Sequence, residues 1–430
     1  MDYFKALSFC DSFAANKSSM SLDNMKTLLG LLGNPHEKVK YIHVAGTNGK
    51  GSVVSFIAEI LKTSGFKVGK FVSPHLVRIN ERFSINGEDI DDNEFAACAE
   101  EINNVITGHE ELKKSLTMFE IMTCMAFLYF NRNDCDMAVL ETGLGGRLDA
   151  TNVIQNPLLT VITMIGFDHT KVLGDTIEKI AYEKACIIKK GNMCVIAPQK
   201  YEGALSVLEK YAEKQQVEVA NVDKSSIVIK ERNIYYQTFD YKSYKDLKIT
   251  LLGNHQTENA ATAVEAISAL CKLGYDIPVE AIYNGLERAK WPCRLEVVNN
   301  EPLTIIDGAH NVDGVIALSD FLRSTFKGKK ITYVFGVMKD KNYKAMIQEI
   351  KDTAKEIYLI EMQYYRAENI DILKSGLDEY GIPSKTFETL GKAIDYSYNS
   401  SSRDDVVCIF GSLYLVGDAK KHILAIKKEM

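Results

Sequence analysis

The sequence has few of the residues that cross-link or interrupt a chain. It holds only 8 prolines in 430 residues, and its 9 cysteines stand singly, without a C-x-x-C pair. An odd number of isolated cysteines argues against a disulfide framework and against a zinc cluster, and it is typical of a reducing cytosol. We therefore expect a cytoplasmic protein.

Long apolar runs and an excess of basic residues are also missing. The longest nearly unbroken apolar stretch, residues 121–130, is far shorter than the ~20 residues that a membrane span needs. The initial Met-Asp-Tyr-Phe-Lys lacks the basic and apolar regions of a signal peptide. A net charge of -6 gives no electrostatic reason for a nucleic-acid partner. We expect neither a membrane nor a nucleic acid as partner.

Length and patterning predict two α/β domains, because the chain exceeds the usual size of one hydrophobic core. Trp291-Pro292 interrupts a helical pattern and is the best linker candidate, since proline disfavours helix at the residue before it. We expect a P-loop-type N-terminal domain with a mainly parallel sheet over residues 1–293. A smaller Rossmann-like C-terminal domain is expected over residues 294–430.

Short apolar runs between helical segments give the expected strands. Helices are predicted over residues 50–64, 176–189 and about 259–273, and period-two alternation between 225 and 252 predicts an antiparallel excursion. The expected strands cover residues 39–45, 67–73, 137–140 and 158–165 of the first domain, and 304–306, 331–335, 356–360 and 406–410 of the second.

The most informative stretch is His43-Val-Ala-Gly-Thr-Asn-Gly-Lys-Gly-Ser52, between a predicted strand and a predicted helix. Glycines let backbone N–H groups converge on phosphate oxygens, and the lysine neutralises the outer phosphates. The spacing departs from G-x-x-x-x-G-K-[ST], because Val44 takes the first glycine position and Gly51 delays the hydroxyl by one residue. A ligand-free glycine turn is the alternative. The predicted ATP-binding residues here are Thr47, Asn48, Gly49, Lys50, Gly51 and Ser52.

Further motifs follow in order along the chain, and together they are specific. With these motifs the chain resembles the folylpolyglutamate synthases of the Mur ligase superfamily. The resemblance favours the bifunctional kind, which is also a dihydrofolate synthase. The matching segments are GTNGKGS (46–52), FVSPHLVRINER (71–82), ETGLGGRLDATN (141–152), DHTKVLG (168–174), IAYEKACIIK (180–189), HQTENAA (255–261), WPCR (291–294) and DGAHN (307–311), with a weaker FGSLY (410–414).

The resemblance implies an ATP-dependent ligase that adds L-glutamate to dihydropteroate or to the γ-carboxylate of folates through an acyl-phosphate. Such chemistry needs Mg²⁺ to screen the phosphates, and Mg²⁺ prefers hard oxygen ligands. Glu141 suits this role because it ends a predicted strand, where ligands of open α/β sheets collect. The resemblance adds Ser73 and His169 as further metal ligands.

Lys184 falls on the apolar side of the helix predicted over residues 176–189, between Ile180 and Ile188. A lysine among apolar groups has a lowered pKa, and its neutral amine can react with CO₂. The resemblance implies a carbamylated lysine here, acting as an anionic metal ligand. The alternative is a lysine whose amine reaches solvent from the edge of the apolar stripe.

The resemblance also implies nucleotide contacts from Asn259, Arg294 and Asp307, and it places His310 near the acyl-phosphate or the nucleotide. The alternative for Asp307 and His310 is that they only stabilise a turn. Lys50, Lys184 and His310 are the expected catalytic residues. One departure from the family is Cys293, where a glycine is usual; a positive φ there would strain cysteine.

The acceptor is expected to bind Thr117, Phe119, Glu120, Asp149 and Ala150. Phe119 could stack on a pterin ring, and a carboxylate of this set could accept its N–H donors. However, aromatic and apolar residues at helical spacing are more often core residues. Alanine at position 150, where monofunctional relatives tend to have serine, favours bifunctionality.

Three alternatives remain. A monofunctional folylpolyglutamate synthase fits most of the motifs. A cell-wall Mur ligase would need a further N-terminal domain, and the roughly 40 residues before the loop strand are too few for one. A regulatory module that hydrolyses ATP slowly would not need Glu141, His169 and Lys184 together. The expected ligands are ATP, Mg²⁺, L-glutamate and a folate or dihydropteroate, and we expect a monomer.

Overall fold

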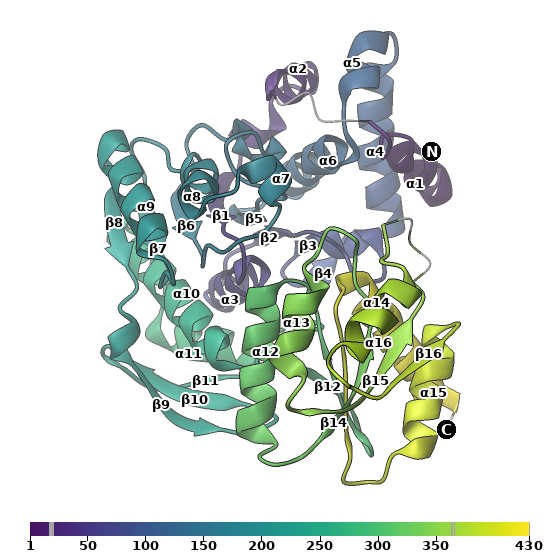
Figure 1. Cartoon of the computed structure of the whole chain (residues 1–430). Helices are drawn as coiled ribbons and strands as arrows, with labels where there is room; N and C mark the ends of the chain where they lie inside the picture. Colours follow the sequence, from purple (N-terminus) through teal and green to yellow (C-terminus); the bar gives the residue numbers. More distant parts are fainter. Residues whose placement is uncertain (17–20, 363, 365, 430) are drawn as a thin grey trace. The chain divides into compact units, whose positions relative to one another are not determined.

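The computed structural model describes residues 1–16, 21–362, 364 and 366–429, and its elements are labelled in Figure 1. These residues form two compact units. The last segment of unit 1 ends at Ala289, and the last segment of unit 2 begins at Lys290. The domain boundary after residue 293 stays a prediction from sequence. Unit 1 comprises Met1–Val228, Tyr241–Leu247 and Glu258–Ala289, and unit 2 comprises Ile229–Asp240, Lys248–Thr257 and Lys290–Met430.

Unit 1 is built on an eight-stranded sheet of order β4-β3-β2-β5-β1-β6-β7-β8. In this order, neighbouring strands from β2 through β5, β1, β6 and β7 to β8 pair in parallel. The pairs of β3 with β2 and with β4 are antiparallel. The mainly parallel sheet predicted from sequence is therefore confirmed. Its strands are β1 (Lys40–Ala45), β2 (Val68–Phe71), β3 (Phe83–Ile85), β4 (Glu88–Asp89), β5 (Met137–Glu141), β6 (Leu159–Ile162), β7 (Met193–Ile196) and β8 (Glu218–Asn221).

Helices cover this sheet, so β5, β6 and β7 are buried along their whole length and β1 along all but its first residue. At Gly69 of β2 a Cβ atom would lie 2.6 Å from the ring of Phe130, so the missing side chain lets α6 approach the strand. The helices are α1 (Tyr3–Asp11), α2 (Asp23–Leu31), α3 (Lys50–Thr63), α4 (Asp92–Ile106), α5 (Glu110–Ser115), α6 (Met118–Arg132), α7 (Thr170–Leu173), α8 (Ile177–Ala185), α9 (Glu202–Gln215), α10 (Asn254–Lys272) and α11 (Val279–Arg288).

The excursion expected between residues 225 and 252 is a separate three-stranded sheet. Its strands are β9 (Ile227–Arg232), β10 (Gln237–Tyr241) and β11 (Tyr244–Ile249), in the order β11-β10-β9. The change from long apolar runs to alternating residues thus marks a change of sheet. The long helix predicted after this sheet is α10, and it begins at Asn254, before the predicted start.

Unit 2 contains a six-stranded sheet of order β12-β13-β17-β14-β15-β16, parallel except for β12 against β13. Every residue of β14 and β17 is buried. Helices separate the parallel strands along the chain, as in the smaller Rossmann-like domain predicted. The elements are β12 (Glu296–Asn300), β13 (Leu303–Asp307), α12 (Val312–Thr325), β14 (Ile331–Phe335), α13 (Tyr343–Ile350), β15 (Ala354–Ile360), α14 (Ile370–Asp378), β16 (Ser384–Phe387), α15 (Leu390–Ser400), β17 (Val406–Phe410) and α16 (Leu413–Glu429).

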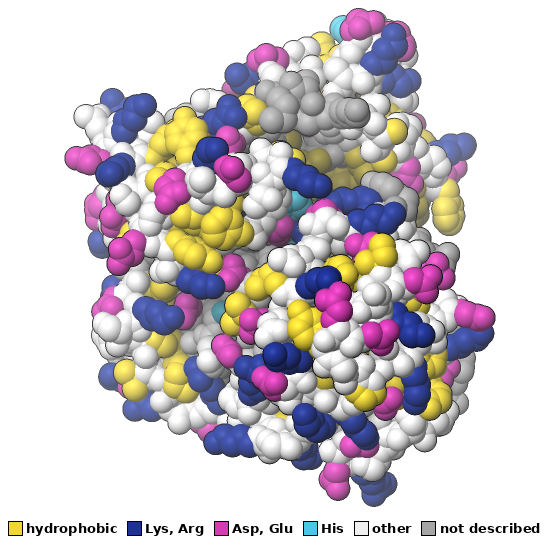
Figure 2. Space-filling view, in the orientation of Figure 1, with side chains coloured by type: hydrophobic (Ala, Val, Ile, Leu, Met, Phe, Trp, Pro, Cys, Tyr) yellow, Lys and Arg dark blue, Asp and Glu magenta, His cyan; other side chains and the backbone are white. Residues whose placement is uncertain are grey.

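The visible face of the molecule carries charges of both signs. Figure 2 shows Lys and Arg side chains interspersed with Asp and Glu side chains over most of the visible face. Among the described helices, none has the length and apolar character that crossing a membrane requires.

Candidate functional site

The glycine-rich loop of unit 1 joins the end of β1 to the start of α3, and two of its glycines are required by geometry. A Cβ atom at Gly46 would lie 1.8 Å from Thr163 Oγ1, so no side chain fits there. Gly49 has a φ of 91°, and a Cβ atom at this position would lie 2.5 Å from the amide oxygen of Asn259. The loop therefore packs closely against two neighbouring segments while turning into the helix.

The start of the loop is fixed by backbone hydrogen bonds to the chain after β6. The amides of Thr47 and Asn48 donate to the carbonyl of Met164 at 2.9 and 3.2 Å, and Thr47 Oγ1 donates to the Gly166 carbonyl at 3.1 Å. These two amides are engaged within the protein. The first N–H groups of α3, which have no partner inside a helix, are the ones suited to phosphate.

Lys50 and Glu141 form a pair at the carboxyl end of β5. Lys50 Nζ lies 3.8 Å from Glu141 Oε1 and donates to the Thr47 carbonyl at 3.3 Å. The Glu141 side chain is only 6 % exposed, and its Oε2 accepts from the Ser73 amide at 3.2 Å. A cation and a carboxylate thus face the loop from one edge of the sheet, where open α/β sheets bind ligands.

Lys184 lies directly beneath the loop. It is 4 % exposed, and its Nζ donates to the Gly46 carbonyl at 2.7 Å. Burial, reinforced by the nearby Lys50 charge, lowers the pKa of Lys184 to about 7. The backbone of α8 comes close because Gly146 has no side chain; a Cβ there would lie 2.5 Å from the Glu183 carbonyl. The amine is therefore held in a dry position with part of its population neutral at pH 7.

His169 immediately precedes α7, with a φ of 50° and an exposed side chain. Its Nε2 lies 3.9 Å from Asp168 Oδ1, and its amide donates to the same oxygen at 2.8 Å. Within the described residues, no three His, Cys, Asp or Glu side chains converge closely enough to hold a metal by themselves. The predicted set of Ser73, Glu141 and His169 stays a prediction.

The donors around Glu141 nevertheless fit magnesium. Mg²⁺ takes one or two carboxylates and keeps several waters, so it does not need three acidic side chains. The Glu141 carboxylate is nearly buried, and the hydroxyl of the next residue, Thr142, is buried with no hydrogen-bond partner in the described structure. This is a hard-oxygen environment beside the lysine of the loop.

The predicted acceptor segment begins α6. Thr117 is the N-cap, and its side chain accepts from the Glu120 amide at 3.3 Å, while Glu120 Oε2 accepts from both the amide and the hydroxyl of Thr117 at 2.7 Å. The Phe119 ring packs over Gly143, where a Cβ would lie 2.4 Å from the ring, and its centroid is 5.9 Å from that of Phe71. Phe119 is half-buried at the edge of the core, so one side of its ring contributes to packing.

Asp149 is buried and organises the loop that follows β5. Its carboxylate accepts from the Leu144 amide at 2.8 Å, from the Thr151 amide at 3.0 Å and from the Thr151 hydroxyl at 2.5 Å. Burial raises the pKa of Asp149, and these hydrogen bonds oppose that rise. Ala150 is buried at the start of a short 3₁₀ turn, Ala150–Val153. Sequence reasoning missed Thr151, because a threonine in a loop carries no signal of its own.

In unit 2, Asp307 ends β13 and accepts from the amides of Leu295 and Ala309, both at 2.8 Å. Burial raises its pKa, and the nearby Arg294 opposes that rise. The guanidinium lies against Gly308, where a Cβ would be 2.2 Å from Arg294 Nη1. His310 Nδ1 donates to the Gly308 carbonyl at 2.8 Å, which fixes the ring on this turn. The structure thus gathers the three predicted residues of unit 2.

Cys293 has the positive φ that was suspected from sequence. Its φ is 58° and its side chain is fully buried. Its amide donates to Glu296 Oε2 at 2.8 Å, and its carbonyl accepts from the Gly308 amide at 2.8 Å. The left-handed conformation costs a non-glycine residue roughly 1–2 kcal/mol, and these two hydrogen bonds hold it in place.

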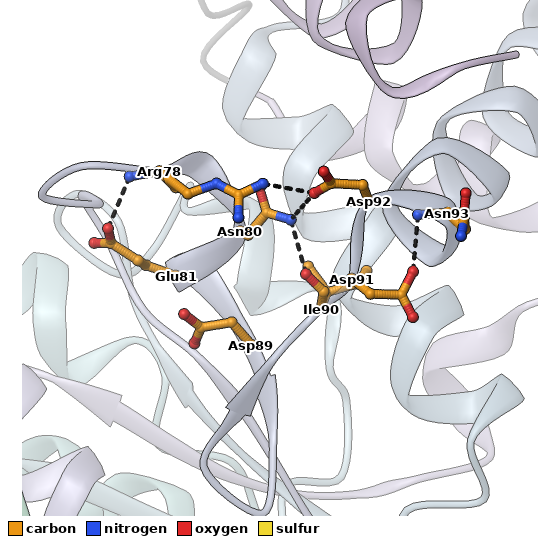
Figure 3. Close-up of a pocket in the computed structure, with 8 residues that line it drawn as sticks. All are labelled: Arg78, Asn80, Glu81, Asp89, Ile90, Asp91, Asp92 and Asn93. Atoms are coloured by element: carbon orange, nitrogen blue, oxygen red, sulfur yellow. Dashed lines mark hydrogen bonds and ion pairs between the residues drawn. The ribbon is translucent and has the colours of Figure 1, made fainter.

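A separate cavity of about 430 Å³ lies in unit 1 beside the segment that matched the family at residues 71–82. Several of the lining residues bind one another or the backbone: Glu81 accepts from the Arg78 amide, Arg78 pairs with Asp92 at 2.6 Å, and Asn80 donates to the Ile90 carbonyl (Figure 3). These contacts tie the loop to the start of α4.

The strand-to-helix glycine loop, the lysine and carboxylate beside it and the parallel sheets define a P-loop-type nucleotide-dependent enzyme of two α/β units. Residues 44–267 match the Mur ligase middle domain, and residues 293–413 match the Mur ligase glutamate ligase domain. The sequence is 38% identical over 411 residues to the dihydrofolate synthase/folylpolyglutamate synthase of Bacillus subtilis, with 94% of each chain covered. It is 33% identical to the folylpolyglutamate synthase of Lacticaseibacillus casei, with 99% of each covered.

Solved structures agree. A folylpolyglutamate synthase of Mycobacterium tuberculosis complexed with ADP has a TM-score of 0.89 at 28% identity, with 98% of each chain covered. A folylpolyglutamate synthase complex with AMPPCP and folate has a TM-score of 0.86 at 31% identity, covering 99% of this chain and 100% of the other. The chain belongs to the folylpolyglutamate synthase family of Mur ligases, and it is an ATP-dependent, ADP-forming ligase.

Proposed function

We propose that this ligase adds L-glutamate both to dihydropteroate and to the γ-carboxylate of tetrahydrofolates. The observation that carries the proposal is the grouping of Lys50, Glu141 and Lys184 around a loop shaped for phosphate. The names of the relatives, and the AMPPCP and folate complex of a homologue, support the substrate class.

The reaction has two steps. A carboxylate oxygen of the acceptor attacks the γ-phosphorus of ATP, the bond from that phosphorus to the β-phosphate oxygen breaks, and ADP leaves. The glutamate amine then attacks the acyl carbon, the bond to the phosphate oxygen breaks, and the amine loses a proton. Lys50 offsets the charge that develops on the transferred phosphoryl group. We assign the phosphates to the amides of Gly49, Lys50, Gly51 and Ser52, with Thr47 and Asn48 shaping the loop.

Magnesium, when bound, neutralises charge on the ATP phosphates. Glu141, Ser73 and His169 would hold it, and the carbamate of Lys184 would add an anionic oxygen. The surroundings of Lys184 support this modification, because a buried amine with a pKa of about 7 is neutral often enough to react with CO₂. A carbamylated nitrogen keeps one N–H, so it could still donate to the Gly46 carbonyl.

The remaining assignments are to residues of both units. We assign Asn259, Arg294 and Asp307 to the nucleotide, and His310 to the acyl-phosphate or the nucleotide. Thr117, Phe119, Glu120, Asp149 and Ala150 form the proposed acceptor site. The half-exposed ring of Phe119 and the alanine at position 150 favour the bifunctional form over a monofunctional folylpolyglutamate synthase or another Mur-type ligase. We propose a cytoplasmic monomer.

Replacement of the loop lysine tests the assignment. Lys50→Ala should lower glutamate-dependent phosphate release by about 10²- to 10³-fold, because a donor aimed at developing charge is lost. Lys62→Ala is the matched control: Lys62 lies on the same helix and pairs with Glu59 at 3.2 Å. Full activity of Lys50→Ala would overturn the mechanism. An ATPase rate that is the same with and without folate and glutamate would favour the regulatory-module alternative.

A further inference from the structure

A buried chain of hydrogen bonds links the strand before the phosphate loop to the proposed acceptor site. His43 lies on β1 and is fully buried, and its Nε2 is 2.7 Å from the hydroxyl of Thr151. That hydroxyl is 2.5 Å from Asp149 Oδ1. The chain therefore runs from the central strand of the sheet through one hydroxyl to the carboxylate that organises the loop after β5.

The direction of each hydrogen bond follows from chemistry. An ionised carboxylate only accepts, so the Thr151 hydroxyl donates to Asp149, and its oxygen is left to accept from His43. His43 must then carry its proton on Nε2. Burial lowers the pKa of His43 to about 3, which keeps the ring neutral, and the hydrogen bond to Thr151 selects the tautomer.

His43 is a costly residue for a purely structural position. Its Nδ1 is buried without a hydrogen-bond partner in the described part of the chain. An unpaired buried nitrogen is unfavourable, and an apolar side chain would fill the same space without this cost. The arrangement is therefore better explained by what Nε2 does to Thr151 and Asp149.

Asp149 sets the shape of the acceptor loop. Its carboxylate accepts from the amides of Leu144 and Thr151, and so closes the loop between them. The same loop contains Gly143, whose bare backbone lies against the Phe119 ring. A small rotation of the Asp149 carboxylate would move the loop relative to the ring on which the pterin is proposed to stack.

We propose that His43 is a positioning residue for the acceptor, acting through Thr151 on the Asp149 carboxylate. This inference rests on the proposed function, since it takes the acceptor to bind beside Phe119 and Asp149. It separates His43 from ATP binding, although the residue precedes the phosphate loop by only a few positions. The loop amides of Thr47 and Asn48 are held by Met164, and the histidine ring forms its hydrogen bond with Thr151.

Four substitutions form two matched pairs. His43→Leu removes the donor and keeps a similar volume, whereas His43→Gln retains an N–H donor. Thr151→Val removes the hydroxyl in the same shape, whereas Thr151→Ser retains it. We expect His43→Leu to raise the KM for dihydropteroate or tetrahydrofolate about tenfold, the size expected for one lost buried hydrogen bond. Thr151→Val removes the hydrogen bonds to both His43 and Asp149, so it should raise this KM at least as much. The KM for ATP should stay within about twofold, and the Gln and Ser variants should recover most of the loss.

The double variant provides the second readout. If His43 acts through Thr151, His43→Leu combined with Thr151→Val should raise the acceptor KM no further than Thr151→Val alone. If His43→Leu does not fold, shown by loss of its thermal transition, His43→Met, which also lacks the donor, takes its place.

Failure of the inference differs from failure of the proposed function. An unmodified enzyme without glutamate-dependent phosphate release would refute the proposed function. An active enzyme whose His43→Leu and Thr151→Val variants keep the acceptor KM, or raise the KM values for ATP and acceptor equally, would refute the positioning role.

Discussion

In the phosphate loop, Gly49 occupies a position where a side chain would collide with Asn259. Gly49 and Gly65 have nearly the same backbone conformation, with φ of 91° and 92°. A Cβ atom at Gly49 would lie 2.5 Å from Asn259 Oδ1, whereas a Cβ atom at Gly65 would meet nothing within 4 Å. The two glycines lie at opposite ends of α3. Alanine at either position would have a strained backbone, but only alanine at position 49 would also displace Asn259.

We expect Gly49→Ala to raise the KM for ATP by at least about tenfold, because the new methyl group pushes Asn259 away from the loop. Gly65→Ala should lower the unfolding free energy by about 1 kcal/mol, the cost of a left-handed alanine, and leave the KM for ATP unchanged. Steady-state kinetics and urea unfolding measure both effects. Equal KM values for ATP in the two variants would show that Asn259 has no part in nucleotide binding.

Lys184 makes stability depend on pH in a defined direction. Its pKa is about 7 in the folded protein and near the ordinary 10.5 in the unfolded chain. Between these values the unfolded chain binds the extra proton, so stability rises with pH there; below pH 7 the penalty of the buried charge is fully present. In CO₂-free buffer, the difference in unfolding free energy between the native enzyme and Lys184→Met should shift in favour of the native enzyme by up to about 1.4 kcal/mol per pH unit. A difference independent of pH above 7 would contradict the lowered pKa.

Among the elements, α6 combines a structural and a functional role at its first turn. Thr117 caps the helix and also binds Glu120, both of which belong to the proposed acceptor site. Thr389 caps α15 of unit 2 in the same way, accepting from the Lys392 amide at 3.3 Å. Thr389 therefore serves as a control for Thr117, because it caps a helix at a position to which we assign no ligand.

Thr117→Ala and Thr389→Ala should each lower the unfolding free energy by about 1 kcal/mol, because each helix loses its cap. Only Thr117→Ala should also raise the KM for the acceptor, since the Glu120 carboxylate loses its hydroxyl donor. Urea unfolding and acceptor titrations distinguish the two effects. An unchanged acceptor KM in Thr117→Ala would reduce this segment to a structural role.

The sequence was informative for most strands that are buried on both sides, although β7, which is buried along its whole length, was not predicted. The apolar runs that became β1, β5, β6, β14 and β17 were located within a few residues, because a parallel strand buried on both faces needs such a run. The half-exposed β12 and β16 were missed, since partly exposed strands on the outer positions of the sheet can carry polar residues such as Asn299 and Lys385. Helix ends were less certain, and α8 stops at Ala185.

The candidate site was predictable to the same extent. The helical position of Lys184 indicated its burial, and motif order indicated the loop, Glu141 and Asp307. Sequence could not indicate that the amides of Thr47 and Asn48 bind Met164, or that His43 reaches Thr151. Both contacts join segments more than 100 positions apart, and a single histidine in a strand pattern does not reveal its partner.

At the scale of the whole molecule, the residues that we assign to the reaction are divided between the two units. Unit 1 holds the phosphate loop, the Lys50–Glu141 pair and the proposed acceptor site, and unit 2 holds Arg294, Asp307 and His310. The match to the Mur ligase middle and glutamate ligase domains follows the same order along the chain. The central claim is that this chain joins glutamate to two different acceptors.

The most direct measurement is phosphate release from ATP with glutamate and either dihydropteroate or tetrahydrofolate, with the products identified by mass. The account predicts release with both acceptors, and a product that is heavier than each acceptor by one glutamyl residue. Release with tetrahydrofolate alone would contradict the bifunctional claim. The absence of glutamate-dependent release with either acceptor would contradict the proposed function itself.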